Sequence, residues 1–153
     1  MSTFINENFL PVEAHIKEHP VYFHRFNAVW TPTVLIMDSS GEERWRIEGY
    51  LPKNEFRAQL EMGLARISFM DKQWADAEQR YAQVIERFAQ TAAAPEAVYW
   101  RGVSRYKRTN DHTVLGGVAQ QLSQKYPDSV WAKKASVWRK PPQTSGVEAQ
   151  ARV

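Results

Sequence analysis

The chain has 153 residues, of which 43% are hydrophobic and 12% aromatic, so it can bury the core of one medium domain or two small ones. It contains no cysteine, which excludes disulfides, thiolate nucleophiles and cysteine-bound metals. Six basic and nine acidic residues precede Gly63, whereas fourteen basic and eight acidic residues lie from there onward, so the positive charge is concentrated in the C-terminal part.

The sequence carries no signal for membrane insertion or export. No run approaches the roughly 18 apolar residues of a membrane span. Residues 1–10 lack the basic and then apolar order of a secretory signal. We therefore expect a cytoplasmic protein without membrane contact, although the absent cysteines leave the redox compartment undetermined.

The first predicted elements are a strand and a short helix. Residues 9–16 alternate partly in polarity between polar flanks, which predicts a strand with Pro11 near its start. Residues 19–26 then predict a helix that begins at His19-Pro20, and Asn27 is a suitable residue to end it.

A hairpin and a longer helix follow in the pattern. Residues 33–37 are β-branched and apolar and predict a buried strand, residues 38–41 predict a turn, and residues 43–49 predict the return strand. Residues 51–55 lead into a predicted helix with helically spaced apolar positions at Phe56, Leu60, Leu64 and Ile67.

The run Trp30-Thr31-Pro32-Thr33, followed by an apolar strand, is the most specific motif of this part. With the order of the surrounding elements, it makes residues 8–61 resemble the thioredoxin-like superfamily from its second core strand to its last helix. The resemblance implies an α/β fold with a mixed sheet, a cis peptide bond before Pro32, and a backbone at Thr31 that pairs with an extended substrate peptide. These are the expected peptide-binding residues: Trp30, Thr31 and Pro32.

The chain departs from that superfamily at its beginning. The first strand, the Cys-x-x-Cys motif and most of the first helix have no counterpart, and residues 1–8 resemble only the end of that helix. In the superfamily, the first strand lies between the strands that correspond to residues 9–16 and 33–37, so both would have unpaired backbone groups. Three alternatives would fill the gap: a second copy of the chain, a rearranged sheet, or residues lost from the start through a misplaced initiation codon.

Residues 63–138 have the apolar period of helices. One stripe runs from Trp74 to Phe88, a second from Ala97 to Tyr106, a third from Val114 to Tyr126, and a last helix is predicted for residues 129–138. Helix pairs at a spacing in the mid-thirties resemble tetratricopeptide repeats. This resemblance implies an all-α region with a concave surface for peptides or proteins, in which Gly102 permits a close approach of the paired helix.

The predicted organisation is therefore a truncated thioredoxin-like domain at residues 1–62, tetratricopeptide-like hairpins at residues 63–138, and a disordered tail at residues 139–153. The tail contains Pro141-Pro142 and has no apolar period.

Candidate partner-binding residues in the helical region are Trp100, Arg101 and Arg105. On a helix, Arg101, Arg105 and Arg108 would share one face, which either meets an acidic partner or is simply solvated. No nucleic-acid motif accompanies them, so we predict no nucleic-acid binding.

Two aromatic and histidine features have more than one interpretation. Trp30 either packs on a ligand beside the Thr31-Pro32 loop or packs into the position of the missing strand. His15, His19 and His24 lack the spacing of a metal site, since His15 and His19 straddle a predicted strand end and a loop. We predict no metal, no cofactor and no catalytic residue.

The sequence thus supports a non-catalytic protein- or peptide-binding module that forms a homodimer through unpaired strand edges. The alternative is a thiol-disulfide oxidoreductase whose Cys-x-x-Cys is missing from this chain. Neither the partner nor the physiological role follows from the sequence.

Overall fold

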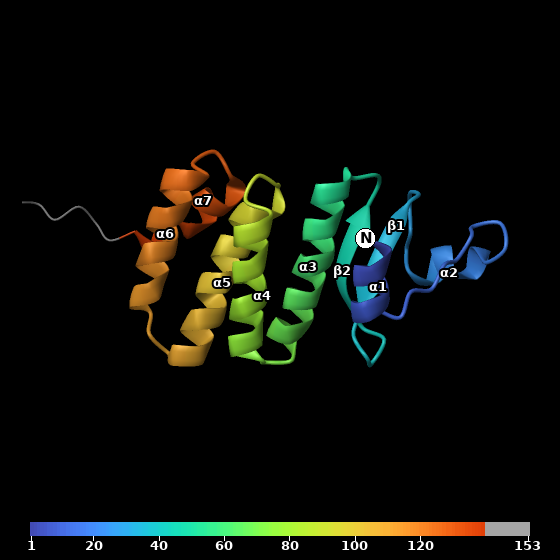
Figure 1. Ribbon diagram of the computed structural model, residues 1–153, viewed down its shortest axis with the longest axis horizontal. Coiled ribbons are helices and arrows are strands. Elements are labelled where there is room, and N and C mark those ends of the chain that lie inside the picture. The colour runs from blue at the N-terminus through green and yellow to red at the C-terminus, as the bar shows by residue number, and fades with distance from the viewer. Residues whose placement is uncertain (140–153) are drawn as a thin grey trace, which may run out of the picture.

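The computed structural model describes residues 1–139, so the predicted tail lies, except for Arg139, outside the described residues. The described part is mainly helical (Figure 1). In chain order its elements are α1 (Ser2–Asn8), α2 (Pro20–Arg25), β1 (Thr33–Met37), β2 (Glu43–Glu48), α3 (Lys53–Met70), α4 (Trp74–Arg87), α5 (Ala93–Thr109), α6 (Thr113–Lys125), α7 (Val130–Ala135) and the 3₁₀-helix η1 (Ser136–Trp138).

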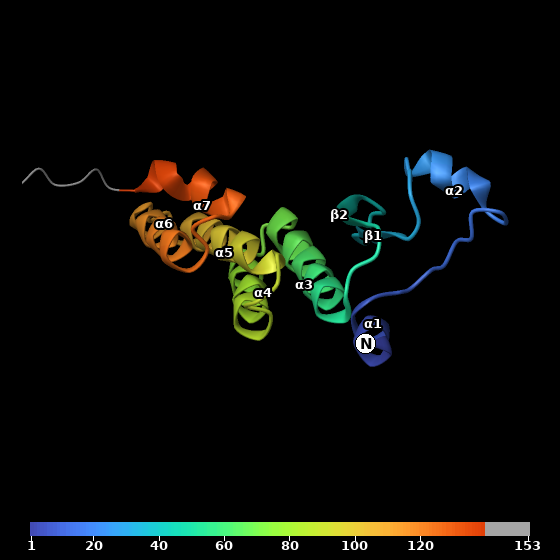
Figure 2. The same ribbon diagram turned by 90° about the horizontal axis from the view of Figure 1, so that it is seen from above.

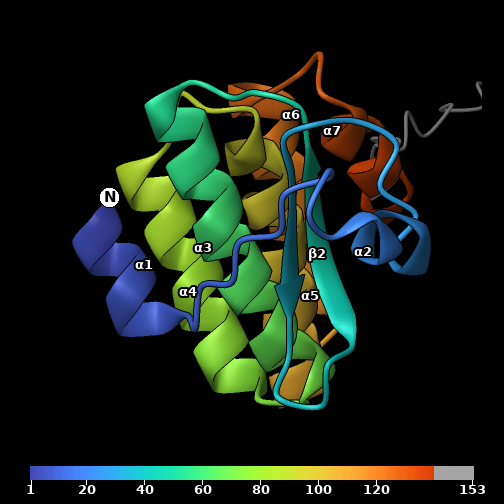
Figure 3. The same ribbon diagram turned by 90° about the vertical axis from the view of Figure 1, so that its right-hand side faces the viewer.

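The elements are arranged as a row of layers. Helices α3, α4, α5 and α6 lie side by side, and the β1–β2 hairpin covers α3 at one end of the row (Figure 1). Seen from above, α7 and the hairpin lie on the same side of the row (Figure 2). Helices α1 and α2 lie on opposite sides of the hairpin (Figure 3).

The hairpin confirms the strands predicted at residues 33–37 and 43–49. Strand β1 pairs antiparallel with β2, with Val34 opposite Ile47 and Ile36 opposite Trp45. These four side chains lie on one face because strand side chains alternate. Ile36 and Ile47 are buried there with Leu60 of α3, which attaches the hairpin to the helical row.

The strand predicted for residues 9–16 is wrong, and so is the mixed sheet that it would have completed. Among residues 1–139 the sheet contains β1 and β2 alone, both antiparallel. Residues 9–15 form an irregular segment in which Leu10 is 92% and Val12 is 84% exposed. A strand needs a neighbour for its backbone groups, and this segment has none.

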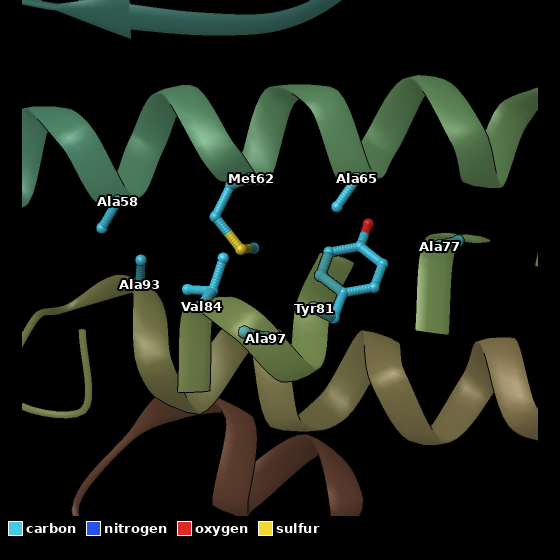
Figure 4. Packing of buried hydrophobic residues seen from close by; sticks show 8 residues of the cluster. All are labelled: Ala58, Met62, Ala65, Ala77, Tyr81, Val84, Ala93 and Ala97. Carbon is cyan, nitrogen blue, oxygen red and sulfur yellow. The ribbon is translucent and has the colours of Figure 1, made fainter. Parts of the chain in front are cut away.

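Helix α3 connects the two predicted domains without a break, so the boundary expected between residues 62 and 63 falls inside it. One side of α3 meets the hairpin and the other meets α4. Figure 4 shows the main helical core, in which Met62 of α3 and Tyr81 and Val84 of α4 pack among alanines of α3, α4 and α5. Its buried members are Ala58, Met62, Ala65, Ala77, Tyr81, Val84, Ala93 and Ala97.

The close approach predicted at Gly102 is confirmed. A Cβ atom at this position of α5 would lie 2.1 Å from Cγ2 of Val118 in α6. A second core cluster forms where α5, α6 and α7 meet, around Val98, Val118 and Leu122. Among residues 1–139, every helix is too short or too polar to cross a membrane.

Candidate functional site

The Trp30-Thr31-Pro32 loop enters β1 from the end of α2. The Thr31–Pro32 peptide bond is cis, as the resemblance implies. Two hydrogen bonds fix the loop: the Thr33 hydroxyl donates to the Trp30 carbonyl at 2.6 Å, and the Gly49 amide donates to the Pro32 carbonyl at 2.8 Å. The predicted peptide-binding residues therefore occupy a defined position at one end of the hairpin.

This loop presents apolar surface to solvent. Trp30 is 68% exposed, so it does not pack into a core. Tyr50 follows the glycine that bonds to Pro32 and is 82% exposed, which adds a second aromatic ring at the same end of the hairpin. Exposed aromatic side chains of this kind are common anchors in binding surfaces.

The outer edge of β1 is open. Among residues 1–139, only β2 pairs with this strand. Because Gly49 bonds to Pro32 and antiparallel bonding alternates, Thr33 and Leu35 direct their N–H and C=O groups away from β2. These groups form a short template onto which an extended backbone could add.

Among residues 1–139, large apolar side chains are exposed more often in the N-terminal part of the chain than in the helical row. Most of the large ones occur within the first fifty residues, in the segments that lead to and follow the hairpin. They are Met1, Leu10, Val12, Ile16, Val21, Tyr22, Val29, Trp30 and Tyr50. Trp30 and Tyr50 belong to this set and lie at the same end of the hairpin.

Arg46 of β2 anchors the segment that precedes the loop. Its guanidinium donates to the Phe26 carbonyl at 2.6 Å and to the Asn27 carbonyl at 3.5 Å. It also forms an ion pair with Glu43 at 2.6 Å, and this hydrogen bond lowers the pKa of the Glu43 carboxyl. The end of α2 is therefore attached to the hairpin by charge-assisted hydrogen bonds.

The structure separates the three predicted partner-binding residues. Arg101 and Arg105 line a groove between α4 and α5, together with Arg108. Trp100 lines a different hollow with Trp45 of β2 and Arg66 of α3. The predicted sharing of one face by Arg101, Arg105 and Arg108 is thus confirmed, but Trp100 lies outside that face.

Trp100 belongs to a chain of half-buried aromatic rings that extends across α3, α5 and α7. Its ring centroid is 5.2 Å from that of Phe69 and 5.5 Å from that of Tyr99. Tyr99 in turn lies 5.1 Å from Trp131 and 4.7 Å from Trp138. These pairs join the helices to one another, which favours a packing role for Trp100.

Glu96 lies beside this aromatic surface, in the hollow that Trp100 lines. Burial raises the pKa of its carboxyl, although the indole of Trp100 and the charges of Lys134 and Arg66 oppose that rise. Arg66 is stacked over the Trp100 ring, with its Cζ atom 4.9 Å from the ring centroid. The ionised carboxylate is therefore unfavourable in the folded state relative to the unfolded state.

We expect Glu96→Gln to raise the melting temperature at pH 7. The raised pKa means that stability is lost as pH rises from the ordinary glutamate pKa through the folded value. The gain should therefore disappear at a pH below the ordinary value, where both states hold a protonated carboxyl. Thermal melts across this pH range test the prediction, with the exposed Glu86→Gln as control. A loss of stability at every pH would show that the neighbouring cations outweigh burial.

His15, His19 and His24, for which the sequence predicts no metal site, all lie within the described residues. Within residues 1–139, no group of three or more histidine, aspartate and glutamate side chains is placed to hold a metal ion. His15 instead accepts a hydrogen bond at Nδ1 from the Lys17 amide, within a local turn.

The N-terminal part of the chain is similar to a known protein family. Residues 2–63 match the model of a thioredoxin-like domain. This match confirms the resemblance inferred from the Trp30–Thr33 motif and from the order of the elements around it. No curated protein and no solved structure matches the chain. The match ends before α4, so the resemblance of α4–α7 to tetratricopeptide repeats remains a prediction.

Sequence reasoning missed two residues near these surfaces. The sequence pattern does not point to Tyr50, although its position after the return strand and Gly49 places it opposite the loop that precedes β1. Glu96 was also missed, since a single glutamate near the start of a helix gives no local sign of burial. Only the neighbouring α3 and β2 make it part of a hollow.

Proposed function

We propose that this chain is a non-catalytic binding module, in which the thioredoxin-like part binds an extended peptide and the tetratricopeptide-like helices bind a protein partner. The open edge of β1 beside Trp30, Thr31 and Pro32 carries the proposal. The complete absence of cysteine supports binding without thiol chemistry.

The mode of binding follows from the edge geometry. A peptide in extended conformation would exchange main-chain hydrogen bonds with Thr33 and Leu35. Its apolar side chains would cover part of the exposed surface near Trp30 and Tyr50. Main-chain bonds would supply sequence-independent affinity, and these aromatic rings would select apolar side chains.

A second copy of the chain is a competing occupant of the same edge. Two β1 strands that pair about a two-fold axis would form one continuous sheet and satisfy both open edges. Sedimentation equilibrium measures this directly. A dimer that dissociates on addition of the peptide would show that both ligands use one site.

The second candidate function is thiol-disulfide exchange by a protein that also contains the superfamily's first strand and Cys-x-x-Cys. The match to a thioredoxin-like domain favours it, together with a free β1 edge at the place where that strand is expected. This cysteine-free chain should not reduce disulfides, because exchange requires a sulfur nucleophile. An N-terminal peptide of the native protein that carries two cysteines would favour this second function.

The binding proposal predicts that Trp30→Ala weakens peptide affinity by about tenfold, which corresponds to about 1.4 kcal/mol. The probes are extended peptides selected from a random library against the wild-type chain, and affinities are measured by fluorescence anisotropy. Val137→Ala, at an exposed position of η1, is the matched control and should leave the affinity unchanged.

Amide hydrogen exchange gives an independent readout of the same proposal. The amides of Thr33 and Leu35 should exchange more slowly when the peptide is bound, since edge pairing would protect them. Binding at this edge would be contradicted if Trp30→Ala leaves the affinity of the selected peptides unchanged and if their binding leaves both amides unprotected.

A further inference from the structure

A groove lies over α5 on the face that carries three arginines. Helix α4 forms one wall of this groove and α5 the other, since all the residues that line it belong to these two helices. The hollow between α4 and α5 has a volume of about 420 Å³. Its lining residues are Ala75, Glu78, Gln79, Ala82, Arg101, Arg105 and Arg108.

The charge of this lining is strongly unbalanced. Among the described residues that line the groove, Glu78 is the one carboxylate that faces the three guanidinium groups. It pairs with Arg108 at 2.9 Å and reaches Arg105 at only 4.0 Å. Glu78 is therefore shared between two arginines, and the three guanidinium groups leave the groove with a net positive charge.

Arg101 is the deepest of the three cations. Its Nη2 atom donates to Oε1 of Gln121, a neutral amide of α6, at 2.9 Å. Within residues 1–139, no carboxylate lies close enough to form an ion pair with it. Burial lowers the pKa of Arg101, which shows that its charge is partly removed from water. A carboxylate ligand would therefore bind it more strongly than the amide does.

The three arginines follow one another at intervals of four and three residues along α5. On an α-helix these intervals correspond to rises of about 6 Å and about 4.5 Å. Glutamates at the same intervals on a partner helix have the same spacing along its axis. The short side chains of Ala75 and Ala82 leave room for such a segment to approach the guanidinium groups.

We infer that this groove binds an acidic polypeptide segment, whose carboxylates pair with Arg101, Arg105 and Arg108. The inference rests on the proposed function as a binding module and assigns the helical part a partner of defined charge. It uses a surface distinct from the β1 edge, so each site is tested separately.

The probe is an alanine-based helical peptide with glutamates at positions i, i+4 and i+7, and the matching glutamine peptide serves as its control. We expect the glutamate peptide to bind, and added salt to weaken that binding. The double variant Arg105→Gln/Arg108→Gln should lower the affinity by at least about tenfold. Lys107→Gln removes the same kind of charge from an exposed position of α5 outside the groove and should have little effect.

Glu78→Gln provides a test that misfolding cannot imitate. This variant removes the carboxylate that competes for Arg105 and Arg108, so it should tighten peptide binding severalfold. If Lys107→Gln and the double variant weaken peptide binding equally, the peptide responds to the overall positive charge of the protein and not to the groove. That result would overturn the inference. No detectable binding of the glutamate peptide would also overturn it.

Two further measurements distinguish a nucleic-acid partner from an acidic peptide, and failure of the groove inference from failure of the proposed function. Tighter binding of a single-stranded oligonucleotide than of the peptide, lost in the same double variant, would identify a nucleic acid as the partner and overturn the inference. The Trp30-dependent peptide is measured on the same protein samples. If that peptide binds and the acidic one does not, the groove inference fails while the proposed function at the β1 edge remains.

Discussion

Tyr81→Ala should lower the free energy of unfolding by about 3–5 kcal/mol, as expected when a large buried ring is truncated to a methyl group. Tyr81 is fully buried in α4 and is the largest of the fully buried side chains. Its ring packs in the cluster that contains Met62 and alanines of α3, α4 and α5, and these alanines are too small to fill the space that it would leave (Figure 4). Urea denaturation monitored by circular dichroism measures the loss.

Tyr81→Phe is the matched control, since it keeps the ring and removes the hydroxyl. Within residues 1–139, this buried hydroxyl makes no close hydrogen bond, although the Arg66 guanidinium lies near enough to oppose the rise in its pKa. Burial raises its pKa well above the ordinary tyrosine value, so it stays protonated at all working pH values. An unsatisfied buried polar group costs about 1–3 kcal/mol, so Tyr81→Phe should be neutral or stabilising. A clear loss of stability would show that the hydroxyl does have a bonding partner.

The helical row could be predicted because its signals are local. The apolar stripe from Trp74 to Phe88 has the period of a helix, and α4 spans nearly the same residues. Ser129 accepts a hydrogen bond from the Ala132 amide at 3.1 Å and begins α7, as expected for a serine before a helix. Each of these elements satisfies its own backbone hydrogen bonds, so sequence period and observed structure agree.

The N-terminal segment could not be predicted in the same way. Residues 9–16 have the composition of a strand, but strand formation depends on a neighbour distant in sequence. The hairpin could be predicted because each strand is the other's neighbour and the turn from Asp38 to Gly41 joins them. The same dependence explains why the open edge of β1, which is the main feature of the candidate site, became visible only in the structure.

Which residues of α5 share one exposed face was also only partly predictable. Consecutive residues of a helix point about 100° apart, so Trp100 and Arg101 cannot share a narrow face. The repeat of Arg101, Arg105 and Arg108 does define one face, and the structure places all three on one groove. Which side of α5 remains open depends on how α4 and α6 pack, and sequence period does not specify that.

Gly102→Ala should destabilise the protein by about 2–3 kcal/mol, near the upper end of the usual cost of overpacking. The new methyl group would lie 2.1 Å from Cγ2 and 3.3 Å from Cβ of Val118. Val118 is buried and β-branched, so its side chain has little freedom to rotate away. The clash should exceed the gain of about 1 kcal/mol that alanine normally brings to a helix.

Two further variants make this prediction specific to the contact between α5 and α6. Gly117→Ala lies next to Val118 in sequence, but apart from its chain neighbours and the backbone of its own helix no described atom is within 4 Å of its new Cβ, so it should stabilise the protein by up to about 1 kcal/mol. Val118→Ala removes the clashing atoms, so the double variant with Gly102→Ala should lose less stability than the two single losses added together. Additive losses would mean that α5 and α6 are not in this close contact in solution.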